Sequence, residues 1–82
     1  MAKVIKFTGE YVNAMVGKVV VRIDGPGQSI EFPSESGKIV GETSGIWGDF
    51  WAIEWDNGHQ EPCAKSGVKP AAELNGIGVY YV

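Results

Sequence analysis

The stretch from Gly41 to Glu61 constrains the fold most, because it combines a strong alternating pattern with a tight-turn signal. Apolar and aromatic side chains alternate here as they do in a β-strand with one buried face. The face expected to be buried carries Trp51, Ile53 and Trp55, and the opposite face carries Phe50, Ala52, Glu54 and Asp56. The Asp56-Asn57-Gly58 run that follows predicts a type I′ hairpin turn, since Asn and Gly tolerate positive φ angles. We therefore expect an antiparallel hairpin at the centre of the domain.

Further short β segments, bounded by glycine and proline, occur along the chain. We expect strands over residues 3–8, 17–25, 29–32, 38–43, 59–64 and 76–82. Gly41 indicates a β-bulge or bend in its strand, and Pro62 marks its strand as an edge, because proline has no N–H to donate. One helical turn is expected near Pro70–Leu74, and residues 9–16 read as a connector. The pattern predicts an all-β fold, a small, strongly bent antiparallel barrel of five to seven short strands.

The length of 82 residues indicates one domain, spanning residues 1–82, because the chain is too short for two cores. The composition, 44% hydrophobic and 21% charged, is that of a folded globular protein. Cys63 is the only cysteine, so no intramolecular disulfide is possible, which fits a reducing compartment. No apolar run is long enough to span a membrane and the N-terminus shows no signal-peptide pattern, so a cytoplasmic location is expected.

Charge is distributed unevenly along the chain. The basic residues of the first half are Lys3, Lys6, Lys18, Arg22 and Lys38, and the Gly41–Glu61 stretch contains acidic residues without any lysine or arginine. The formal net charge of −3 argues against nucleic-acid or membrane-surface binding, which depends on clustered basic residues. The asymmetry fits either complementary patches for self-association or a partner, or two ordinary solvated faces.

The order of these segments resembles an SH3-like barrel, in which a single turn precedes the last strand. Within that superfamily the chain is most similar to the plasmid- and integron-borne type II dihydrofolate reductases. The similarity rests on Gly37–Gly41 (GKIVG), Trp51–Glu54 (WAIE) and Pro70–Leu74 (PAAEL). It implies a bacterial gene-cassette origin and, for the reductase itself, a homotetramer with an NADPH-binding pore. The pore of that family is lined by a Val-Gln-Ile-Tyr run, where this chain has His59–Cys63 (HQEPC).

A ligand or partner site is predicted around the glycine-flanked loop that carries Trp47. Together with Phe50 and the carboxylates of Glu42 and Asp49, Trp47 would form an aromatic–acidic surface for a cationic small molecule or a protein. The alternative is that Trp47 folds over one end of the barrel as part of the core.

A subunit interface is the second predicted site. Alternation in the strand over residues 17–25 turns Val19, Val21 and Ile23 inward and Val20 outward. One tyrosine of the Tyr80-Tyr81 pair must also face outward, and we expect Val20 and Tyr80 at the interface of a homo-oligomer. The alternative is that they are ordinary scattered apolar residues on the surface.

No catalytic or metal-binding constellation emerges. His59 and Cys63 are four residues apart on one strand, about 13 Å, which is too far for a nucleophile–base pair. Glu54 and Asp56 alternate outward into solvent, and no phosphate-binding glycine motif is present. The sequence therefore favours a non-catalytic, SH3-like binding or assembly module without a cofactor. The alternatives are a divergent type II dihydrofolate reductase using NADPH and a nucleic-acid-binding SH3-like domain.

Overall fold

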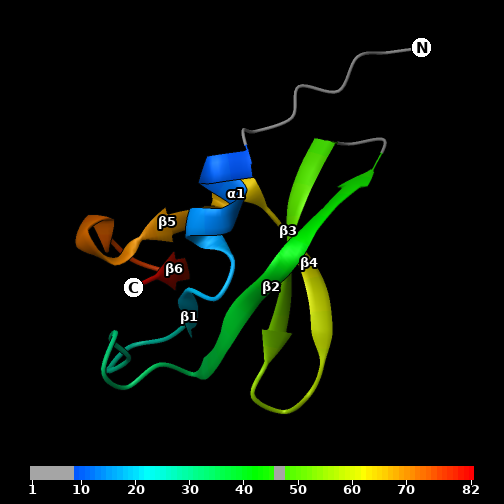
Figure 1. Cartoon of the computed structure of the whole chain (residues 1–82). Helices are drawn as coiled ribbons and strands as arrows, with labels where there is room; N and C mark the ends of the chain where they lie inside the picture. Colours follow the sequence, from blue (N-terminus) through cyan, green and yellow to red (C-terminus); the bar gives the residue numbers. More distant parts are fainter. Residues whose placement is uncertain (1–8, 46–47) are drawn as a thin grey trace.

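The computed structural model describes residues 9–45 and 48–82 and contains a single curled sheet (Figure 1). The elements in chain order are α1 (Gly9–Met15), β1 (Val19–Ile23), β2 (Glu35–Gly45), β3 (Gly48–Trp55), β4 (Gln60–Ala64), η1 (Lys65–Gly67), β5 (Val68–Pro70), η2 (Ala71–Glu73) and β6 (Gly78–Tyr81). The strand order is β4-β3-β2-β1-β6-β5. The sheet bends into a half-barrel, which confirms the prediction of a small all-β barrel. Within the described residues, no helix is long and apolar enough to cross a membrane.

The predicted hairpin is formed by β3 and β4, and the longest pairing in the sheet is between β3 and β2. β3 lies between β2 and β4 and pairs antiparallel with both. The register of β2 shifts between Ile39 and Gly41, which confirms the bulge predicted there. Pro62 lies on β4 at the edge of the sheet, also as predicted, because an edge strand tolerates a missing N–H. The pairing departs from a fully antiparallel sheet at one place, since β5 and β6 are parallel.

The turn between β3 and β4 differs from the predicted type I′ form. The Gly58 N–H donates to the Trp55 carbonyl (2.8 Å), and the Trp55 N–H donates to the His59 carbonyl (2.8 Å). Of the turn residues, only Gly58 has a positive φ, at +86°, whereas a type I′ turn needs two such residues. The connection is therefore a three-residue loop in which a glycine with left-handed backbone follows a type I turn.

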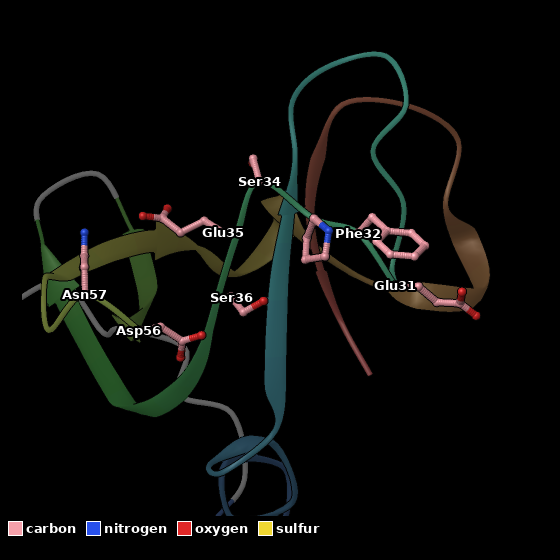
Figure 2. Close-up of a pocket in the computed structure, with 8 residues that line it drawn as sticks. Glu31, Phe32, Ser34, Glu35, Ser36, Asp56 and Asn57 are labelled. Atoms are coloured by element: carbon pink, nitrogen blue, oxygen red, sulfur yellow. The ribbon is translucent and has the colours of Figure 1, made fainter.

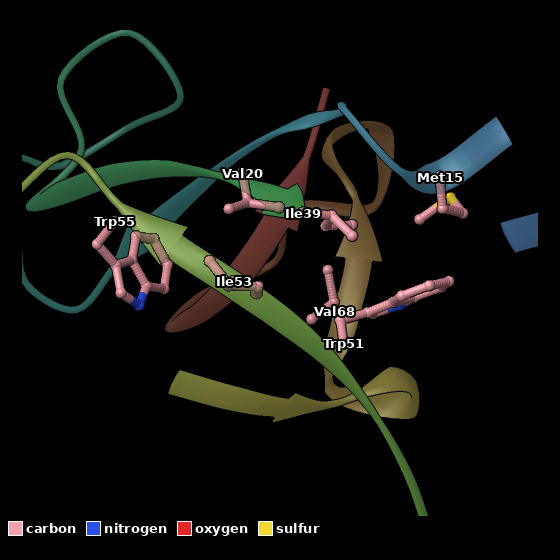
Figure 3. Close-up of a cluster of buried hydrophobic side chains, with 7 residues drawn as sticks. All are labelled: Met15, Val20, Ile39, Trp51, Ile53, Trp55 and Val68. Atoms are coloured by element: carbon pink, nitrogen blue, oxygen red, sulfur yellow. The ribbon is translucent and has the colours of Figure 1, made fainter. Parts of the chain in front are cut away.

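The core fills the concave side of the sheet (Figure 3). Its buried members are Met15, Val20, Ile39, Trp51, Ile53, Trp55 and Val68. The inward orientation predicted for Trp51, Ile53 and Trp55 is confirmed, because all three are almost fully buried. Each of these side chains contributes about 1.5–3 kcal/mol through removal from water, which makes β3 the main source of stability.

Two segments differ from their predicted structure. Residues 9–15 form a short helix in place of a connector, because Val12 and Met15, one turn apart, pack on the core and stabilise it. Residues 29–32 form a tight turn in place of a strand, with reciprocal hydrogen bonds between the backbones of Ser29 and Phe32 (3.1 and 3.2 Å). The strand predicted over residues 3–8 lies outside the described residues.

Candidate binding groove

The connection from β1 to β2 presents Phe32 to solvent. The Asp24 N–H donates to Gln28 Oε1 (2.7 Å), and the Phe32 N–H donates to Ser29 Oγ (3.2 Å). At its end, the backbone N–H and the hydroxyl of Ser34 both donate to the Arg22 carbonyl (2.9 Å each). These bonds fix the path of the connection while the Phe32 side chain stays 71% exposed.

An open groove of about 650 Å³ runs from Phe32 to the β3–β4 turn (Figure 2). One end is formed by Glu31, Phe32 and Pro33, and the other by Asp56 and Asn57. Glu35 and Ser36, at the start of β2, lie between them. The Asp56 N–H donates to the Ser36 carbonyl (2.8 Å), so the backbone ties the Asp56 end of the groove to the start of β2.

The charge of the groove is negative. Of its three carboxylates, Glu35 pairs with Arg22 (3.2 Å). Glu31 and Asp56 are exposed, and neither makes an ion pair with a basic residue within the part of the chain that the structure describes. The groove therefore combines an accessible aromatic ring with negative charge that no described basic residue neutralises, the chemistry that binds cations.

Arg22 supports the groove from the concave side of the sheet. Its guanidinium stacks on the Trp55 ring, 4.6 Å from the ring centroid, and forms a hydrogen-bonded ion pair with Glu61. The Trp55 indole N–H donates to the same carboxylate oxygen of Glu61 (2.7 Å). The Arg22–Glu61 ion pair links β1 to β4, and β4 lies at the far edge of the sheet. The ion pair therefore fixes the curvature of the half-barrel.

The contacts among Arg22, Trp55 and Glu61 shift the pKa of Glu61, and the pKa of Cys63 is shifted as well. Burial alone would raise the pKa of Glu61, but hydrogen bonds from Arg22 and Trp55 and the positive charge of Arg22 outweigh it and lower that pKa. Burial raises the pKa of the Cys63 thiol, and the negative charge of Glu61 adds to the increase. Cys63 is therefore a neutral, half-buried thiol near neutral pH.

The structure does not assemble the predicted aromatic–acidic site. Glu42 forms an ion pair with Lys65 (2.6 Å), whose ammonium lies 4.4 Å from the centroid of the Trp51 ring. The register places Glu42 and Asp49 on the face of Trp51 and the half-buried Phe50 on the opposite face, so Phe50 and the two carboxylates do not share a surface. Trp47, the fourth predicted residue, lies outside the described residues.

The outward orientation on which the predicted interface rested is wrong. Val20 is 0% exposed and belongs to the main core, and Tyr80 is 1% exposed. Tyr80 packs with Val21 and Ile23 in a second cluster on the other side of β1, and its hydroxyl donates to the Gly76 carbonyl (3.0 Å). Simple alternation failed because β1 is covered on both faces, as central strands can be.

Phe32 is the functional candidate that the alternating pattern missed. The sequence pattern places it at the end of the strand expected over residues 29–32, directly before Pro33. The mostly polar segment between Pro26 and Pro33 is typical of a loop, and an aromatic residue between an acidic residue and a proline on such a loop is a candidate contact residue.

The geometry is suited to binding. Within residues 9–45 and 48–82, no three His, Cys, Asp or Glu side chains come together as a metal site. No protein-family model, curated protein or solved structure matches this chain.

Proposed function

We propose that this protein is a non-catalytic binding and assembly module with an SH3-like barrel, and that its groove binds a basic segment of a partner. The observation that carries this proposal is the 71% exposure of Phe32 in a groove whose Glu31 and Asp56 carboxylates make no ion pair within the described residues. An exposed aromatic ring costs free energy in water, and the groove around it offers both cation–π attraction and direct charge attraction.

The fold supports a binding role because the groove is built on fixed elements. Both ends are tied to the sheet by backbone hydrogen bonds, through Ser34 on one side and Asp56 on the other. A preformed groove avoids the entropy cost of ordering loops on binding. The homo-oligomeric state belongs to the same proposal, since a basic segment of a second copy is one candidate partner.

The proposal is tested with a fluorescent hexa-arginine peptide, followed by anisotropy at low salt. We expect Phe32→Ala to weaken binding about fivefold to tenfold, from the loss of a cation–π contact of about 1 kcal/mol or more. Asp56→Asn should weaken binding and reduce its salt dependence, because one charge attraction is lost.

Ile77→Ala is the matched control, since Ile77 is 79% exposed but lies outside the groove. Its affinity should equal that of the wild type. Equal binding of hexa-glutamate, or unchanged affinity in both groove variants, would contradict the proposal.

A further inference from the structure

The groove is suited to a partner segment that carries both positive charge and apolar side chains. Phe32 and Pro33 provide the apolar surface, and Glu31 and Asp56 provide the negative charge. A purely basic segment would leave the Phe32 ring in water, and a purely apolar one would bury the carboxylates without a partner.

The first eight residues of this chain, MAKVIKFT, have this composition. They contain the basic residues Lys3 and Lys6 and the apolar residues Val4, Ile5 and Phe7. In an extended segment Lys3 and Lys6 are about 10 Å apart, at ~3.3 Å per residue, with apolar residues between them. On the basis of the proposed function, we propose that the groove of one molecule binds residues 1–8 of a second copy.

A second copy is required because of where the segment is attached. Gly9 begins α1, which Figure 1 places at the opposite end of the sheet from the 24–34 connection and the β3–β4 turn. Figure 2 shows the same separation of α1 from the groove. Lys6 and Phe7 are within three residues of Gly9, a reach of about 10 Å, so they cannot occupy the groove of their own molecule.

Charge complementarity gives a role to part of the uneven charge distribution, because Lys3 and Lys6 lie at one end of the chain and Asp56 lies in the acidic Gly41–Glu61 stretch. The −3 net charge opposes self-association as a whole, so attraction must be local. A basic terminus that meets an acidic groove provides local attraction and leaves the remaining surface repulsive. Binding of this kind is reciprocal in a two-fold dimer, where each copy gives one segment and one groove.

The test uses the full chain and measures solution mass by light scattering over a range of concentrations. The wild type should associate at low salt and dissociate at 1 M salt, where charges more than about 3 Å apart are screened. K3E/K6E and E31K/D56K should each raise the dissociation constant of the dimer at least tenfold. The quadruple variant should restore association, because the exchanged charges attract again and its net charge equals that of the wild type.

Lys69→Glu is the control, since Lys69 is an exposed lysine on β5, away from the groove. A wild type that stays monomeric at low salt would overturn the inference. Association that survives K3E/K6E but not E31K/D56K would also overturn it, since a different segment would then occupy the groove. In both cases, binding of hexa-arginine that depends on Phe32 would leave the proposed function standing.

Discussion

At the scale of single residues, the two tryptophans of β3 share one arrangement. The Lys65 ammonium lies over the ring of Trp51 and pairs with Glu42. The Arg22 guanidinium lies over the ring of Trp55 and pairs with Glu61. Each tryptophan thus binds a cation of its own chain. The cation–π chemistry that was predicted for a ligand is used here to fix side chains around the core.

Glu61 gives this arrangement a measurable pH dependence. Its pKa is lower in the folded protein, so its ion pair stabilises the fold above the unfolded-state pKa of about 4.3 and the stabilisation is lost as the pH falls through the folded-state pKa. We expect Glu61→Gln to lower the free energy of unfolding by about 1–2 kcal/mol at pH 7, towards the low end of the ~1.5–3 kcal/mol for hydrogen bonds to a charged group because the Glu61 side chain is partly exposed. The difference should shrink towards zero below pH 4.

Urea unfolding at several pH values between 3 and 7 measures this effect. Glu73→Gln, at an exposed glutamate on η2, is the control and should leave stability within 0.5 kcal/mol of the wild type at every pH, in the usual range for surface changes. A Glu61→Gln curve parallel to that of the wild type would show that the ion pair does not contribute.

At the scale of elements, the success of the sequence pattern depended on how many faces of a strand are covered. β3 has one face in the core, so its alternation identified Trp51, Ile53 and Trp55 correctly. β1 is packed on both faces, so alternation placed Val20 outside and Val19 inside, whereas Val19 is 51% exposed. The helix α1 was missed because tertiary packing of Met15, and not local propensity, makes so short a helix stable.

Gly37 and Gly41 of β2 differ in how closely the neighbouring strand packs against them. A Cβ added to Gly37 would lie 2.5 Å from the Glu54 carbonyl oxygen and 2.9 Å from the Trp55 Cα, so the backbones of β2 and β3 would have to move apart. A Cβ added to Gly41 would meet nothing within 4 Å. We expect Gly37→Ala to cost about 2–3 kcal/mol of unfolding free energy, in the range for overpacking, and Gly41→Ala less than about 1 kcal/mol.

Chemical denaturation of the two variants side by side provides the measurement. Tryptophan fluorescence should also change in Gly37→Ala, since the added methyl group would contact the Trp55 ring at 3.0 Å. Equal stabilities of the two alanine variants would mean that β2 and β3 are not packed this closely at Gly37.

At the scale of the whole molecule, the barrel class was predictable from the sequence but the candidate groove was not. The groove joins residues 31–36 to residues 56 and 57, which no local pattern relates. They meet because Gly37 pairs with Trp55, a consequence of the β2–β3 register. The reductase and nucleic-acid alternatives remain predictions.

The same long-range pairing leads us to expect that the domain unfolds as one unit. The core joins α1 through Met15, β1 through Val20 and β5 through Val68 to the two tryptophans of β3, so each of these elements loses its largest buried partners once β3 is lost. In a Trp47→Phe background, fluorescence would report Trp51 and Trp55 alone, and far-ultraviolet circular dichroism would report the sheet. The two probes should give coincident urea transitions, because a small domain with one main core unfolds in two states. Separate midpoints would show that the edge formed by β5 and β6 opens independently, and the second cluster around Tyr80 would then be a distinct folding unit.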